Sequence, residues 1–131
     1  MILQPTNPKL TVWCLIIVLI GLLMSKASIA QDQDVEAGKA LFQTHCASCH
    51  GEKGDGNGPA AEQLILKPRD FALAAFKFDT DANWERGTDE DIANVIKNGA
   101  AVYGGSTMMV PWNQLGDQEI KGLVSYIRSL D

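Results

Sequence analysis

The chain has 131 residues, a formal net charge of −5 and 46% hydrophobic residues. This length allows one small domain, whose hydrophobic core is close to the lower limit for stability without a bound group. The acidic balance argues against a protein that binds nucleic acid or an anionic membrane surface.

The first 30 residues have the layout of a signal peptide. A polar start with a single lysine is followed by an apolar run over residues 10–24 and by small residues that end at Ala30. We predict a signal peptide over 1–30, with cleavage after Ala30, because a bilayer span normally needs about 20 apolar residues. An uncleaved anchor is the alternative. The exported domain, 31–131, would hold 16 acidic and nine basic residues, a formal charge of −7.

A helix is predicted to begin at Asp34, as its N-cap, and to run through Thr44. Gly38 and Phe42 lie four residues apart and therefore on the same face of this helix. A glycine inside a helix costs roughly 1 kcal/mol relative to alanine. Gly38 therefore predicts that another helix crosses at close range.

Residues 46–50, directly after this helix, read Cys-Ala-Ser-Cys-His. Two thiols at this spacing add to one haem, and the adjacent imidazole binds its iron. A structural zinc site needs a second ligand pair, and the chain offers only Cys14 in the leader. A dithiol redox site would follow a strand, and none is predicted here. The motif predicts one covalent haem c, attached through Cys46 and Cys49, with His50 as proximal iron ligand.

The rest of the chain predicts further helices joined by long loops. A short helix is expected over 59–66, and an irregular loop over 67–87. The segment 76–78 is the only candidate strand, and it serves equally as a loop over the haem edge. Thr88 and Asp91 predict a capping box at the start of a third helix, which should stop at Asn98 and Gly99.

The last helix is predicted to follow Gly116 as N-cap. Its apolar residues recur at helical spacing. Leu123 and Tyr126 are expected to face Gly38 and Phe42 on the first helix. The sequence therefore predicts an all-α domain.

The CxxCH motif lies near the start of the predicted exported domain, with the Gly38–Phe42 pair before it and the Leu123–Tyr126 pair after it. In this arrangement the sequence resembles the class I c-type cytochromes over residues 34–130. The resemblance implies the class I cytochrome c fold, with three to five helices and long loops wrapped around one covalently bound haem. It also implies a methionine as distal iron ligand. Met109, three residues before Trp112, is preferred, and Met108 is the alternative. Both could instead be packing residues.

The resemblance also bears on the surroundings of the haem. A proline carbonyl is expected to hold the second nitrogen of His50, and Pro59 is the preferred match, with Pro68 as the alternative. Arg69 could pair with a haem propionate or with Asp70. His45 is expected at the surface.

The function implied by the resemblance is that of an electron carrier, not an enzyme. It would carry single electrons by outer-sphere transfer between redox protein donors and acceptors in the periplasm or another extracytoplasmic space. No nucleic acid partner and no stable membrane insertion after cleavage are expected. The alternatives are a haem-bearing subunit of a larger periplasmic or membrane oxidoreductase, and a ligand-binding haem protein if no methionine binds the iron.

Overall fold

The computed structural model describes residues 32–73 and 75–130. The predicted signal peptide lies outside these residues. The described helices are the 32–45 helix, α2 (Ala47–His50), α3 (Asp89–Asn98) and α4 (Asp117–Arg128), with the short 3-10 helices η1 (Ala61–Gln63) and η2 (Ala101–Tyr103). Within the described ranges no residue is in a strand, and 76–78 is a loop, which confirms the all-α prediction. No helix described is long and apolar enough to cross a membrane.

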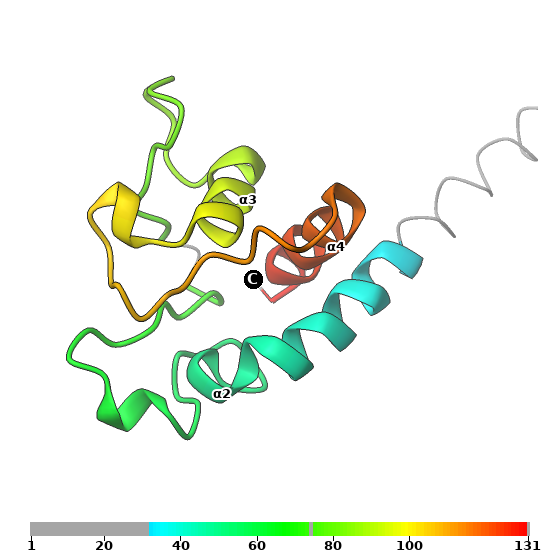
Figure 1. Cartoon of the computed structure of the whole chain (residues 1–131). Coiled ribbons are helices and arrows are strands. Elements are labelled where there is room, and N and C mark those ends of the chain that lie inside the picture. The colour runs from blue at the N-terminus through cyan, green and yellow to red at the C-terminus, as the bar shows by residue number, and fades with distance from the viewer. Residues whose placement is uncertain (1–31, 74, 131) are drawn as a thin grey trace, which may run out of the picture. The chain divides into compact units, whose positions relative to one another are not determined.

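The 32–45 helix and α4 cross at two glycines, and α4 lies between this helix and α3 (Figure 1). A Cβ atom placed on Gly38 would overlap the carbonyl oxygen of Gly122, so the two backbones are in direct contact. One turn further along, the rings of Phe42 and Tyr126 lie 5.2 Å apart. The predicted close crossing is confirmed.

The first helix is present near Asp34, as predicted, but the predicted role of Asp34 as its N-cap is wrong. The two residues before Asp34 are already helical. The Asp34 carboxylate instead accepts hydrogen bonds from Gln118 Nε2 at 2.7 Å and from Lys121 Nζ at 2.9 Å, both on α4. Asp34 therefore ties the two crossing helices together instead of capping one of them.

Both later helices begin as predicted. At the start of α3 the Thr88 hydroxyl accepts a hydrogen bond from the Asp91 amide at 3.1 Å, and the Asp91 carboxylate accepts one from the Thr88 amide at 2.9 Å. The helix stops at Gly99, whose φ of 76° favours glycine. Before α4, the amide of the N-cap Gly116 donates to the Glu119 carboxylate at 2.8 Å.

The helix predicted over 59–66 is reduced to the single turn η1. Leu64, directly after η1, already has extended backbone, with ψ of 130°. The segment before η1 is bound to α2, since the amides of Gly58 and Ala60 donate to the carbonyls of Cys49 at 3.2 Å and Ser48 at 2.9 Å. These bonds fix the start of the segment against α2, and the extended backbone at Leu64 ends the turn.

Asp91 is the one charged side chain among the described residues that is buried, with an exposed fraction of 2%. One carboxylate oxygen accepts from the amide and hydroxyl of Thr80, and the other from the amide and hydroxyl of Thr88. Burial alone would raise the pKa of Asp91, but these four hydrogen bonds outweigh it and lower the pKa to about 2.

We expect the Asp91 carboxylate to make the free energy of unfolding depend on pH in the acidic range. The ionised form is favoured in the folded state, so it stabilises the fold fully above the pKa of the unfolded chain, 3.8, and the stabilisation is lost as the pH falls towards about 2. The loss should amount to roughly 2 kcal/mol. Urea unfolding of the wild type and Asp91→Asn should give a difference that shrinks between about pH 5 and pH 2. A difference independent of pH would contradict this role.

Candidate cofactor site

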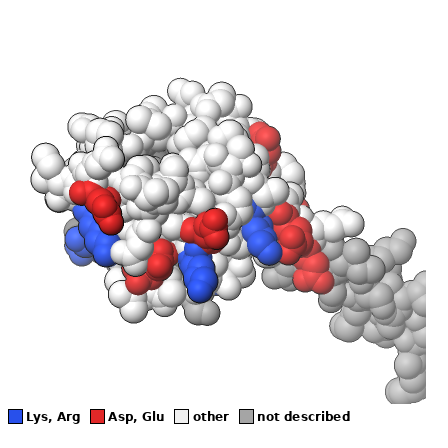
Figure 2. All heavy atoms as spheres, turned by 90° about the horizontal axis from the view of Figure 1, so that it is seen from below, with Lys and Arg blue, Asp and Glu red and all other residues white. Residues whose placement is uncertain are grey.

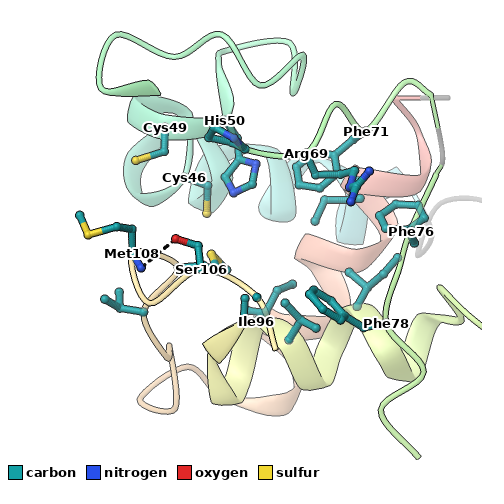
Figure 3. Close-up of a pocket in the computed structure, with 18 of the residues that line it drawn as sticks. Cys46, Cys49, His50, Arg69, Phe71, Phe76, Phe78, Ile96, Ser106 and Met108 are labelled. Atoms are coloured by element: carbon teal, nitrogen blue, oxygen red, sulfur yellow. Dashed lines mark hydrogen bonds between the residues drawn. The ribbon is translucent and has the colours of Figure 1, made fainter. Parts of the chain in front are cut away.

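A cavity of about 800 Å³ opens between α2, α3, α4 and the loops that join them (Figure 3). This volume lies in the range of sites that hold cofactors and other small molecules, and the lining is mainly apolar. The residues that line it include every predicted thioether and iron-ligand candidate: Cys46, Cys49, His50, Met108 and Met109.

The Cys-x-x-Cys-His motif forms a single helical turn. Cys46 is the N-cap of α2, and its carbonyl accepts hydrogen bonds from the amides of Cys49 at 3.1 Å and His50 at 2.9 Å. The Cys46 thiol and the His50 imidazole point into the cavity (Figure 3). The turn therefore presents both thiols and the imidazole at one end of the cavity.

Both thiols are half-buried and free. Burial, with a smaller contribution from Cys49, raises the pKa of Cys46 to about 11. A dithiol redox centre needs a thiolate, and therefore a lowered pKa. The environment of Cys46 does not supply one.

The His50 imidazole is packed between aromatic rings. It stacks on Phe71, with ring centroids 4.8 Å apart and 16° between the planes, and Phe42 lies at 6.3 Å. Burial lowers the pKa of His50, and the backbone of Arg69 partly opposes this effect. The neutral imidazole, which is the form that binds a metal, is therefore favoured.

The second nitrogen of this imidazole, Nδ1, is buried and has no hydrogen bond of ordinary geometry within the described part of the chain. Pro59, the preferred candidate to hold it, is exposed and is not among the residues that line the cavity. Pro68 and Arg69 do line it. The placement favours the Pro68–Arg69 segment over Pro59 as the neighbour of Nδ1.

Arg69 has no ion pair with Asp70 among the described residues. The Asp70 carboxylate instead accepts a hydrogen bond from the Ala72 amide at 3.1 Å. The guanidinium of Arg69 is thus available at the cavity, as Figure 3 shows.

The two methionines differ in their placement. Met109 is half-buried, whereas Met108 has an exposed fraction of 63% and its thioether turns away from His50 (Figure 3). The Met109 carbonyl accepts a hydrogen bond from the Ala100 amide at 3.1 Å, and its amide donates to the Ser106 carbonyl at 3.2 Å. One bond therefore ties Met109 to the residues that follow α3, and the other closes a turn within its own loop.

His45 is exposed, as predicted, and its ring lies 4.9 Å from that of Trp112. Trp112 is held in turn by a hydrogen bond from its amide to the Ile96 carbonyl at 3.0 Å. This contact places His45 beside the methionine-bearing loop at the mouth of the cavity.

The aromatic wall of the cavity is formed by Phe71 and Phe76. Sequence reasoning considered 76–78 as a loop over the haem edge but missed Phe71. Phe71 stacks on both His50 and Phe76, the latter at 6.1 Å, and the Arg128 guanidinium lies 5.1 Å above the Phe76 ring. Phe71 lies in a loop without periodicity, so no spacing marked it. The signal that existed was composition, since large aromatic residues in an irregular segment need a surface to cover.

The donor set fits a covalent haem. Two thiols on one helical turn, a neutral buried imidazole and an apolar cavity match the requirements of a haem c, with a methionine thioether on a separate loop. The buried, unpartnered Nδ1 is the kind of atom that a metal-bound histidine normally has held by a neighbouring acceptor.

Comparison with known proteins agrees with this chemistry. The family Cytochrome c matches residues 35–131. Cytochrome c-554(547) of Halothiobacillus neapolitanus is 30% identical over 99 residues, which cover 74% of this chain and 97% of that protein. The cbb3-type cytochrome c oxidase subunit CcoP of Helicobacter pylori (strain 52) is 24% identical over 100 residues, which cover 76% of this chain.

A chain of the Kuenenia stuttgartiensis reducing HAO-like protein complex is similar in structure, with a TM-score of 0.62, 38% sequence identity and 72% of this chain covered. The match spans 28% of the CcoP subunit and 41% of the HAO-like complex chain, so in both cases it is one part of a longer protein. The family match covers most of the chain and agrees with the helices and the cysteine motif, and the chain therefore belongs to the cytochrome c family of electron-transfer proteins, whose members bind covalent haem c.

Proposed function

We propose that this chain is an exported carrier of single electrons with one haem c. The observation that carries the proposal is the α2 turn, which presents two thiols and a neutral imidazole to an apolar cavity that is lined on another loop by Met109. Export is supported by the leader-like residues 1–30 and by the fact that thioether attachment takes place outside the cytoplasmic membrane.

In this proposal Cys46 and Cys49 would hold the haem covalently, and His50 and Met109 would bind its iron. When bound, the haem supplies an iron that gains and loses one electron. A thioether is a soft, neutral ligand, so Met109 favours the reduced state relative to a second histidine. No bond of a substrate needs to be made or broken.

The remaining task of the chain is to hold these ligands still and to exclude water. Phe71 fixes the ring plane of His50 by stacking, and the backbone bonds of Met109 fix the loop on the other side. The direct contact of Gly38 with Gly122 keeps the two helices behind the site rigidly together. A coordination sphere that changes little between redox states transfers electrons with little reorganisation.

The surface near the site suits contact with other proteins. Leu66, Met108 and Val110 line the cavity and are each at least half exposed, and Ile65 is fully exposed. We infer that redox proteins dock here mainly through apolar contact. Figure 2 shows another aspect of the surface: on the face drawn there, charged side chains of both signs lie close to one another.

A second candidate is a haem-bearing part of a larger oxidoreductase. It is favoured by the relation to CcoP and to the HAO-like complex, where the matched region is part of a longer chain. The 97% coverage of cytochrome c-554(547) favours a free carrier. Gel filtration of native extracts separates the two, because a free carrier elutes as a small monomer and a subunit elutes with its complex.

Absorption spectra of the purified protein, oxidised and reduced, together with its pyridine haemochrome, test the proposed function. A haem c with two saturated axial positions is expected, and the reduced protein should not bind carbon monoxide. Ready binding of carbon monoxide by the wild type would favour a ligand-binding haem protein instead. A spectrum without any haem would refute the proposal.

The choice of methionine gives a separate prediction. Met109→Ala should abolish the far-red methionine-to-iron band of the oxidised protein, open the iron to carbon monoxide and lower the midpoint potential, because a soft ligand is lost. Met108→Ala is the matched control and should change none of these, since its side chain is exposed. The opposite pattern would assign the ligand to Met108.

A further inference from the structure

Asp91 is a buried charged residue that also lines the cofactor cavity. It lines the cavity, its exposed fraction is 2%, and no lysine, arginine or histidine pairs with it among the described residues. Its four hydrogen bonds all come from neutral donors of Thr80 and Thr88. Lys67, Arg69 and Lys77 line the same cavity, but among the described residues none of them forms an ion pair with Asp91. The wall of the site therefore contains a full negative charge that no direct ion pair neutralises.

We propose that Asp91 tunes the midpoint potential of the haem downwards through this fixed charge. The proposal rests on the haem occupying the cavity described above. Oxidation adds one positive charge at the iron, and a negative charge in the low-dielectric wall stabilises that charge more than it would in water. Asp91 acts at a distance and is thus a tuning residue, not an iron ligand.

The hydrogen bonds explain why this charge persists. The donors come from two separate segments: Thr80 donates to one carboxylate oxygen of Asp91 and Thr88, at the start of α3, to the other. Asn94 extends the network by donating to the Thr80 hydroxyl at 3.0 Å. These bonds also lower the pKa of Asp91 to about 2, so the group is ionised near neutral pH.

A purely structural role for Asp91 predicts the opposite sign. If its bonds served only to hold the cavity wall, their loss would loosen the wall and admit water. Greater exposure of a haem to water stabilises the oxidised state and lowers the potential. Loss of the charge should raise the potential, so the direction of the shift separates the two roles.

The test is a redox titration of the purified haem protein, wild type and Asp91→Asn. We expect the reduced state to be favoured about tenfold more strongly in the variant, which for one electron is about 59 mV upwards. Glu90→Gln is the matched control, because it removes the same charge at an exposed neighbouring position. Its shift should be much smaller and should vanish at high salt, whereas that of Asp91→Asn should persist.

A second variant covers the case in which Asp91→Asn fails to take up haem. Asn94→Lys puts a cation beside the network and removes none of the four bonds to the carboxylate, so the potential should again rise. A shift no larger than that of Glu90→Gln, or a downward shift, would overturn the tuning role while the haem spectrum remained normal. A wild-type protein without haem would instead refute the proposed function.

Discussion

Replacement of both Cys46 and Cys49 by alanine is expected to abolish covalent haem attachment and to leave the chain largely unfolded. Without a large apolar group in the cavity, the aromatic wall and the methionine loop have little to pack against. A chain of this length buries too little apolar surface alone to offset the conformational entropy of folding. Mass spectrometry should show no haem adduct, and circular dichroism should show loss of most of the helical signal.

Ser48→Ala is the matched control for this experiment. Ser48 lies between the two cysteines and is exposed, so its replacement should leave haem attachment and helix content unchanged. A double cysteine variant with the helix content of the wild type would show that the fold does not depend on the attached haem.

The second large effect is expected at the crossing of the 32–45 helix and α4. Intrinsic helix propensity alone would make Gly38→Ala stabilising by roughly 1 kcal/mol. The structure predicts the reverse, because the added Cβ would overlap the Gly122 carbonyl, which is backbone and cannot rotate away. We expect a loss of about 3 kcal/mol or more, as for severe overpacking of a core.

Chemical denaturation of the haem protein measures this loss. Lys39→Ala, at the next and exposed position of the same helix, should change the free energy of unfolding by less than about 0.5 kcal/mol. A stabilised Gly38→Ala protein would mean that the two helices do not touch at this point.

The parts of the fold that could be predicted from the sequence are those set by local chemistry. Thr88 and Asp91 mark the start of α3 because a capping box needs only residues three apart. Gly38 revealed the helix crossing because its cost in a helix needs a compensating contact. The Cys-x-x-Cys-His motif indicated the cofactor because both thiols and the imidazole lie on one turn.

The parts that could not be predicted depend on distant residues. Asp34 has the character of an N-cap, yet Gln118 and Lys121, more than 80 positions away, take its carboxylate. The 59–66 segment has helix-forming residues, but its backbone turns extended at Leu64 and leaves only the single turn η1. The neighbour of His50 Nδ1 depends on the path of a long loop, which proline positions alone do not fix.

The convergence of Thr80 and Thr88 on one carboxylate has a consequence for the segment between them. Because Asp91 joins the two ends, the exposed residues 81–86 form a loop that does not contribute to the core. Trp84 in this loop is 93% exposed. Changes of length in such a loop leave the joined ends in place. This loop is therefore the natural point at which to insert a tag or a fluorescent label without disturbing the electron-carrying part of the protein.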